Sequence, residues 1–314
     1  MNRRSLLAAM FGLALAPAAA AQEKLPVVAS FSILADMVRQ IGGDRVAVTA
    51  LVGPDGDAHV FQPSPADART LTAAKMLVVN GLGFEGWMGR LVRASGFQGV
   101  TITASEGVKR REMAEEHEHG QGQSRGGRMQ KGITRPPTVA DPHAWQDLAN
   151  GRLYAVNIAK GLAAADPAGA ATYERNLAAY LARIDAMDRD VRVRIGTIAP
   201  DKRKVITSHD AFGYFGAAYG ITFVAAVGIS TEAEASAADV ARIVRQMRRE
   251  GVRAVFVENM TDARLIEQIA KEAGGAAGGT LYADALSPKD GPAPTYLGMF
   301  EHNVKVLVAG MAAN

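Results

Sequence analysis

The hydrophobic and polar positions of this chain alternate between two patterns along most of its length. In the first half, short β-branched runs predict strands at Val27–Ser30, Val46–Leu51, Met76–Asn80 and Val100–Thr103. In the second half, similar runs predict strands at Lys204–Ser208, Ile221–Ala225, Val252–Glu258 and Thr280–Ala283. Between them, helical spacing of apolar residues predicts helices at Ile33–Ile41, Ala66–Ala74, Ala237–Arg249 and Asp262–Ala273. The alternation predicts an α/β fold with a mostly parallel four-stranded sheet, flanked by helices, in each half.

The longest helical pattern lies between the two halves. Apolar residues keep helical spacing from 173 to 195, Asp166 and Pro167 precede them, and Pro200 follows. A helix over residues 168–197 would be about 45 Å long at 1.5 Å per residue. That length favours one rigid helix that joins two lobes. A crossover helix inside a single large domain is the alternative.

The N-terminus has the pattern of an export signal. Arg3 and Arg4 precede the apolar run Leu6–Leu15, and the small residues Ala18–Ala21 follow it. The run is too short to cross a hydrocarbon core of about 30 Å, which disfavours a membrane anchor. The paired arginines leave the export route, general or twin-arginine, open. The predicted divisions are a signal peptide (1–21), an N-terminal lobe (22–167), a linking helix (168–197) and a C-terminal lobe (198–314).

Composition narrows the possible chemistry. The chain contains no cysteine, which excludes disulfides, thiol catalysis and cysteine metal sites. For the same reason we expect no lipid attached to an N-terminal cysteine. The formal charge of +3 falls to +1 without Arg3 and Arg4, and no basic stripe with interleaved aromatic residues is present. We therefore expect no nucleic-acid partner. Metal binding would have to use histidine, aspartate and glutamate.

One segment differs in composition from the rest. Residues 110–135 are rich in Glu, Gly, Gln, Arg and Lys and contain no aromatic residue, so they cannot bury a core. We expect an unstructured, flexible surface loop over about 110–138. It carries His117 and His119 in an acidic run. These two residues are candidates for a weak auxiliary metal site or for docking a metallochaperone, and a solvated loop is the alternative.

Four residues are candidates for a binding site. His59 lies in a loop opened by Gly-Pro-Asp-Gly at 53–56, and His143 lies in Asp-Pro-His-Ala-Trp before a helical stretch. His209 and Asp284 each directly follow a predicted strand. Ligands of open α/β sheets bind beyond the carboxyl ends of the strands, so a site that draws on both lobes is expected. Taken singly, each residue could instead be a hydrogen-bonded loop, turn or cap residue.

Several longer segments together resemble a known family. They are His-Val-Phe-Gln-Pro-Ser-Pro-Ala-Asp, Asp-Pro-His-Ala-Trp, Thr-Ser-His-Asp-Ala-Phe-Gly-Tyr-Phe, Gly-Ile-Ser-Thr-Glu-Ala-Glu-Ala-Ser, Val-Phe-Val-Glu-Asn and Ala-Asp-Ala-Leu-Ser. In this order, and over essentially the whole mature chain, they resemble the zinc-specific solute-binding proteins of ABC importers, of the ZnuA and AztC types in cluster A-I.

The resemblance implies a function and a site. It implies a periplasmic, monomeric receptor, not an enzyme, that delivers Zn²⁺ to a permease and its ATPase. It also implies two lobes joined by a long rigid helix, with one metal bound in the cleft between them. The implied ligands are His59, His143, His209 and Asp284.

The residue types of this set indicate which metal it prefers. Three imidazoles and one carboxylate suit a closed tetrahedral Zn²⁺ site. Similar proteins that carry manganese or iron place Glu where His209 stands, and Mn²⁺ prefers oxygen ligands. His209 is therefore the discriminating position, and a manganese or iron receptor is the main alternative. Cu²⁺ and Ni²⁺ would also bind such a site tightly.

Two further functions stay open on the residues alone. Catalytic zinc keeps one position free, so an enzyme would require a site of three histidines with Asp284 as a base. An exported structural or adhesin-like protein stabilised by metal is the other possibility. His302 is expected to be structural. Asp141, Glu232 and Glu234 are either acceptors that orient the ligand imidazoles or solvated and capping residues.

Overall fold

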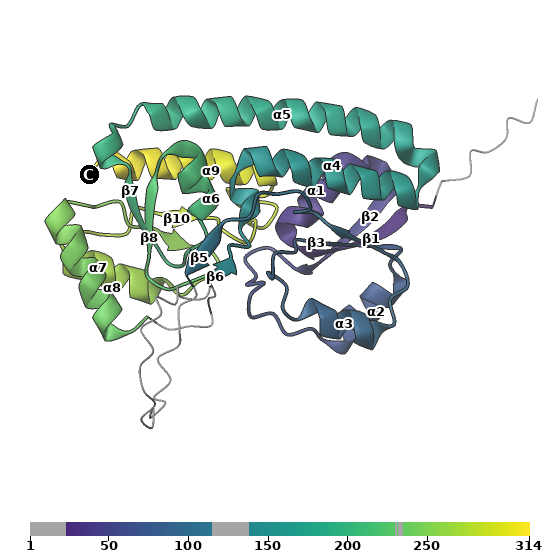
Figure 1. Cartoon of the computed structure of the whole chain (residues 1–314), viewed down its shortest axis with the longest axis horizontal. Coiled ribbons are helices and arrows are strands. Elements are labelled where there is room, and N and C mark those ends of the chain that lie inside the picture. Colours follow the sequence, from purple (N-terminus) through teal and green to yellow (C-terminus); the bar gives the residue numbers. More distant parts are fainter. Residues whose placement is uncertain (1–22, 115–137, 230, 232–234) are drawn as a thin grey trace, which may run out of the picture.

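The computed structural model describes residues 23–114, 138–229, 231 and 235–314. In this part of the chain, two lobes lie side by side beneath one long helix that runs along both (Figure 1). No helix among these residues is long and apolar enough to cross a membrane. The predicted signal peptide (1–21), His117, His119, Glu232 and Glu234 lie outside the described residues.

The first lobe is built on a parallel sheet with the strand order β2-β1-β3-β4. Its strands are β1 (Leu25–Phe31), β2 (Val46–Val52), β3 (Met76–Val79) and β4 (Val100–Thr103). Its helices are α1 (Ser32–Gly42), α2 (Pro65–Ala73), α3 (Met88–Ser95) and α4 (Leu148–Ala165). The central strand β1 is buried from Val27 to Phe31, which explains an apolar run that only Ser30 interrupts.

The second lobe contains shorter parallel ladders. Its strands are β7 (Lys204–Thr207), β8 (Thr222–Ala225), β9 (Val257–Glu258) and β10 (Thr280–Leu281). Its helices are α6 (Gly213–Tyr219), α7 (Ala237–Glu250), α8 (Ala263–Ala273) and α9 (Tyr296–Met311). β7 pairs with β8 and β9 pairs with β10, and an isolated parallel bridge between Ile206 and Val255 connects the two pairs. The four predicted segments thus lie side by side, as an α/β lobe requires.

The strand predicted at Val252–Glu258 is regular only at its end. The backbone N–H groups of Arg253 and Ala254 donate to the side-chain oxygen of Asn314, at 2.7 and 2.9 Å. Their N–H groups therefore bind the C-terminal residue, while the Ala254 carbonyl accepts the backbone N–H of Ile206 in β7 at 2.9 Å. The hydrophobic run is present, but its first half is held by a contact that the local pattern does not reveal.

Several helices begin at side-chain caps. α2 begins with a capping box between Ser64 and Asp67, followed by Pro65 at its first position. Ser236 caps α7 and Thr295 caps α9 in a similar way. These polar residues satisfy backbone N–H groups that no helical carbonyl can reach.

The long helix α5 (Ala170–Gly196) confirms the predicted helical pattern. Its 27 residues bury a narrow stripe of apolar and aromatic side chains: Tyr173, Tyr180, Ile184, Val191 and Ile195. The helix packs against α1 and α4 of the first lobe and against α6 and α9 of the second. One rigid element therefore contacts both lobes (Figure 1).

The expectation of an unstructured segment over 110–138 is wrong at both of its ends. β5 (Glu112–Ala114) pairs antiparallel with β6 (Thr138–Ala140). Beside this hairpin, the backbone N–H of Arg111 donates to the Tyr214 hydroxyl at 2.9 Å, and its guanidinium lies 3.4 Å from Asp141. The ends are ordered by partners distant in sequence, which a polar composition cannot indicate.

The hydrophobic core is continuous across the two lobes. One cluster of buried side chains includes Phe31 and Trp145 in the first lobe and Phe215, Tyr296 and Phe300 in the second. A smaller separate cluster lies beneath α7 and α8. Because the larger cluster crosses the junction, a large rotation of one lobe against the other would expose buried apolar surface.

Candidate metal centre

His59 is positioned by the turn that follows β2. The chain reverses through Gly53–Gly56, where Gly56 N–H donates to Gly53 at 3.2 Å. The Asp57 carboxylate then accepts the backbone N–H of His59 at 2.9 Å. The imidazole is only 7% exposed and packs edge-on against Phe84, with ring centroids 4.8 Å apart. The side chain of His59 is therefore directed inward, between the lobes.

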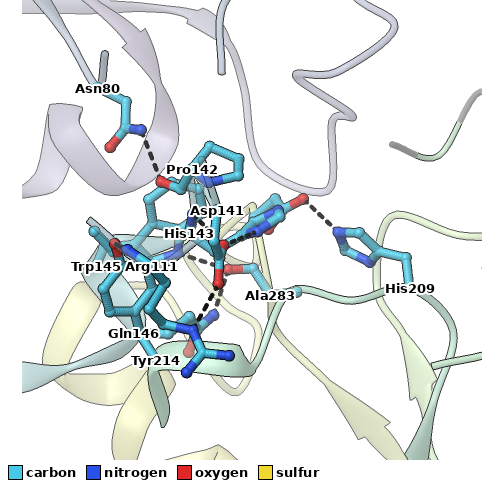
Figure 2. A network of polar contacts seen from close by, with 12 residues as sticks. Asn80, Arg111, Asp141, Pro142, His143, Trp145, Gln146, His209, Tyr214 and Ala283 are labelled. Atoms are coloured by element: carbon cyan, nitrogen blue, oxygen red, sulfur yellow. Dashed lines mark hydrogen bonds and ion pairs between the residues drawn. The ribbon is translucent and has the colours of Figure 1, made fainter. Parts of the chain in front are cut away.

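His143 directly precedes the 3-10 turn η2 (Ala144–Gln146), which leads to α4. The Asp141 carboxylate accepts both the backbone N–H of His143 at 3.0 Å and its ring Nδ1–H at 2.9 Å (Figure 2). Both residues are completely buried. A carboxylate on one ring nitrogen fixes the tautomer and leaves Nε2 free to bind a metal. Of the two roles considered for Asp141, the structure supports the acceptor that orients an imidazole.

His209 follows β7, and Glu258 ends the neighbouring strand β9. The Glu258 carboxylate accepts the backbone N–H of His209 at 2.9 Å and also binds its ring Nδ1. Both side chains are fully buried. Glu258 is a site residue that was not predicted, although it stands in the segment Val-Phe-Val-Glu-Asn. The signal that points to it is its place at the end of a predicted strand, the same position that identifies His209 and Asp284.

Asp284 follows β10 and lies between the histidines. One carboxylate oxygen, Oδ2, is 3.0 Å from His209 Nε2 and 3.2 Å from His59 Nε2. The other, Oδ1, is 3.7 Å from His143 Nε2, and it is buried without a hydrogen-bond partner. His59 Nε2 and His143 Nε2 are 3.2 Å apart.

The structure brings together every residue of the predicted ligand set. Among the described residues, one ligand atom from each lies within 4.8 Å of all the others, and we call this group the metal-site cluster: His59, His143, His209 and Asp284. Two members, His59 and His143, come from the first lobe and two, His209 and Asp284, from the second, so the cluster lies where the two lobes meet. Neutral imidazole nitrogens and a carboxylate are donors that a divalent cation can accept together.

The charges within the cluster are strongly coupled. Burial lowers the pKa of the His209 imidazole, but the charges of Glu258 and Asp284 outweigh burial and hold that pKa well above its ordinary value. Burial raises the pKa of the Asp284 carboxyl, but His209 and His143 outweigh it and hold the pKa well below its ordinary value. Without a metal, a positive imidazolium therefore satisfies the negative carboxylates. A bound cation would replace the imidazolium proton as the positive charge that balances these carboxylates.

His302 lies apart from the cluster. Its Nε2 is 2.9 Å from the Thr280 carbonyl, and its ring packs against Tyr282 with centroids 5.2 Å apart. These contacts agree with the structural role expected from the sequence.

Comparison with known proteins gives consistent matches over most of the chain. The family model described as zinc-uptake complex component A periplasmic matches residues 27–310. The iron ABC transporter substrate-binding lipoprotein MtsA of Streptococcus pyogenes serotype M1 is 30% identical over 307 residues, covering 93% of this chain and 91% of the relative.

Solved structures agree with this match. The periplasmic zinc-binding protein TroA from Treponema pallidum has a TM-score of 0.79 and 25% identity, covering 92% of this chain and 99% of TroA. The manganese-bound periplasmic metal-binding protein from Candidatus Liberibacter asiaticus has a TM-score of 0.76 and 29% identity, covering 92% of this chain and all of that one.

These matches confirm the resemblance and the two-lobed α/β fold inferred from the sequence. They also confirm that the protein is not an enzyme, because the family consists of substrate-binding proteins. The names of these similar proteins refer to iron, zinc and manganese, so the fold alone does not select one metal. The chain belongs to the family of periplasmic metal-binding receptors that serve ABC importers.

Proposed function

We propose that this receptor captures one Zn²⁺ per chain in the metal-site cluster and delivers it to an ABC importer, which comprises a permease and an ATPase. One observation carries the proposal: three imidazole Nε2 atoms and a carboxylate converge at a buried point between the lobes. Asp141 and Glu258 hold two of the rings in orientations that expose Nε2. Such carboxylate–histidine pairs are typical of histidine metal sites.

The donor set favours zinc over the metals named for some relatives. Three nitrogens and one oxygen match the closed tetrahedral coordination of structural or transported Zn²⁺. Mn²⁺ favours sites rich in carboxylate and water oxygens. Cu²⁺ and Ni²⁺ would compete on affinity alone, so availability in the periplasm contributes to selectivity.

Other parts of the proposal follow from the sequence. Residues 1–21 would direct export and be removed, and the mature receptor would act as a monomer in the periplasm. The lobes would comprise residues 22–167 and 198–314, with the linking helix between them. His117 and His119 would form a weak auxiliary zinc site, and a periplasmic metallochaperone is a further partner to test.

Competitive loading tests the choice of metal. Metal-free protein would be incubated with equal, limiting amounts of Zn²⁺, Mn²⁺ and Fe²⁺ under anaerobic conditions, desalted and analysed by inductively coupled plasma mass spectrometry. We expect about one zinc per chain, since four protein donors complete a tetrahedral shell. Preferential retention of manganese or iron would contradict the proposal.

A manganese or iron receptor of the same fold is the second candidate. The manganese-bound structure and the iron-related name among the similar proteins favour it. His209→Glu distinguishes the two, because it replaces an imidazole by a harder carboxylate at the discriminating position. The variant should lose zinc preference in the same loading experiment. Unchanged zinc retention would show that His209 does not set the metal.

A structural or adhesin-like protein that needs metal to fold is the third candidate. The continuous core around the cluster favours a receptor that stays folded without metal. Circular dichroism after chelation separates these functions. Loss of the helical signal on chelation would favour the structural role.

A further inference from the structure

The chain has two tryptophans, and each contacts a loop that carries one member of the metal-site cluster. Both are buried, with Trp87 only 3% exposed and Trp145 completely covered. Each indole N–H donates to the backbone carbonyl of the residue immediately before a member of the cluster. For Trp87 that member is His59, and for Trp145 it is Asp284.

Trp145 and Gln146 hold the loop of Asp284. The Trp145 indole N–H donates to the Ala283 carbonyl at 2.9 Å, and the Gln146 side-chain amide donates to the same oxygen at 2.8 Å (Figure 2). Both donors lie on the turn η2, directly after His143. One turn of the first lobe therefore fixes His143 and also the loop of the second lobe that carries Asp284.

These donors are themselves held rigidly. The Trp145 ring packs against Phe31 and Phe84, with centroids 5.0 and 4.9 Å apart, and its carbonyl accepts the Tyr296 hydroxyl at 2.6 Å. Gln146 is fully buried, yet its Oε1 has no hydrogen-bond partner. Burying an unsatisfied polar atom is costly. The donor half of the Gln146 amide is the part that makes a contact.

Trp87 binds the loop that carries His59. Its indole N–H donates to the Ala58 carbonyl at 2.8 Å, and its ring packs against Phe61 with centroids 4.8 Å apart. Ala58 is fully buried. The peptide that leads into His59 is thus fixed on one side by Trp87 and on the other by the Asp57 carboxylate.

We propose that Trp87 and Trp145 are positioning residues for metal capture, Trp87 for His59, and Trp145 with Gln146 for Asp284. The inference rests on the proposed metal ligands. Neither tryptophan binds the metal; each fixes the backbone from which one ligand projects. His209 depends on neither, because Glu258 holds both its backbone N–H and its ring. His59 and Asp284 are therefore held by different tryptophans, although Trp145 also packs against the His143 ring, with centroids 5.3 Å apart.

Double-mutant cycles test this assignment. Trp87→Phe and Trp145→Phe remove the N–H donor but keep an aromatic ring, and each would be combined with His59→Ala and with Asp284→Ala. Zinc affinity would be measured by competition with a chromophoric chelator. We expect each single tryptophan variant to bind zinc about 10-fold more weakly, as for other residues that orient ligands.

The expected pattern is selective. Trp87→Phe should cause no further loss in the His59→Ala background but its full loss in the Asp284→Ala background. Trp145→Phe should show the reverse. A general structural role would lower affinity equally in every background and would overturn the positioning inference alone. Wild-type affinity in both alanine variants would instead overturn the ligand assignment, and this inference with it.

Gln146→Met provides a second probe of Asp284 that leaves the aromatic packing intact. It should follow the same pattern as Trp145→Phe and should change the visible spectrum of Co²⁺ bound in the cluster. Gln98→Met is the matched control, because Gln98 also donates to a backbone carbonyl, that of Gly96, but is exposed. Circular dichroism would verify the fold of each variant. If Gln146→Met changed neither the Co²⁺ spectrum nor the zinc affinity, the proposed role of Gln146 would be wrong.

Discussion

At the scale of single residues, His209 lies between two carboxylates, with Glu258 on Nδ1 and Asp284 on Nε2. Its pKa is well above the ordinary value of 6.5 because these charges outweigh burial. The metal-free imidazole therefore carries a proton on each nitrogen near neutral pH. A metal can replace the proton on Nε2, whereas the proton on Nδ1 stays with Glu258.

Zinc binding should consequently release about one proton near neutral pH, since a ligand must lose its proton to bind. Affinity should fall as the pH is lowered, because protons then compete more strongly for Nε2. Isothermal titration calorimetry in two buffers of different ionisation enthalpy would measure the release. Equal binding heats in both buffers would show that no proton leaves.

The same charges stabilise the metal-free fold over a defined range of pH. The contribution of Asp284 is complete above the ordinary carboxyl pKa of 3.8 and is lost as the pH falls through its lower folded value. The contribution of His209 is complete below its ordinary pKa of 6.5 and is lost as the pH rises through its higher folded value. Between these limits the pair holds the empty cluster together.

Glu258→Gln should weaken zinc binding by about 10- to 100-fold, the range typical of residues that orient metal ligands. The neutral amide keeps the shape of the side chain but removes the charge that orients His209. Chelator competition measures the effect. Glu250→Gln is the control, because Glu250 pairs with Lys204 at the edge of the same lobe, at 3.0 Å. Equal affinities in both variants would contradict the role of Glu258.

The sequence reveals the members of the metal-site cluster more readily than the residues that orient them. His209 and Asp284 stand at strand ends, and His59 lies in a recognisable loop motif. Glu258 is 49 residues from His209, and only the pairing of their strands brings the two together. Trp145 likewise contacts a carbonyl 138 residues away. Such long-range hydrogen bonds leave no periodic signal in the sequence.

At the scale of elements, the Tyr296 side chain of α9 packs against α4 where Gly151 has no side chain. A Cβ at this position would lie 2.4 Å from the Tyr296 hydroxyl, which binds the Trp145 carbonyl. Gly151→Ala should therefore destabilise the fold by about 1–3 kcal/mol through overpacking, although alanine favours helix by about 1 kcal/mol. Denaturant unfolding measures the change. Gly89→Ala, on the exposed face of α3, should be neutral or stabilising, and equal effects would contradict this account.

Helices and strands are predicted accurately from the local hydrophobic pattern where their buried residues recur at regular spacing. β4 has the predicted bounds, and α5 begins and ends within two residues of the prediction. The predictions fail where tertiary contacts replace local ones. β5 pairs with β6, and Asn314 binds the backbone N–H groups of Arg253 and Ala254 ahead of β9.

At the scale of the whole molecule, the continuous core and α5 connect both lobes into one body. Capture of a metal should therefore order the loops of the cluster without reorienting the lobes. Hydrogen–deuterium exchange with and without zinc would test this prediction. Protection should increase around residues 57–60, 209–211 and 283–286 and stay unchanged in α5. Loss of protection throughout α5 on chelation would instead indicate a hinge.

If the proposed function is right, the receptor encloses Zn²⁺ with the metal-site cluster and with no other ligand. X-ray absorption spectroscopy of the zinc-loaded protein tests it most directly, because the spectrum reports both coordination number and imidazole scattering. We predict four nitrogen and oxygen neighbours of the zinc at about 2.0–2.2 Å, three of them from imidazoles. A shell of five or six oxygen-rich neighbours, or one with fewer than three imidazoles, would contradict it.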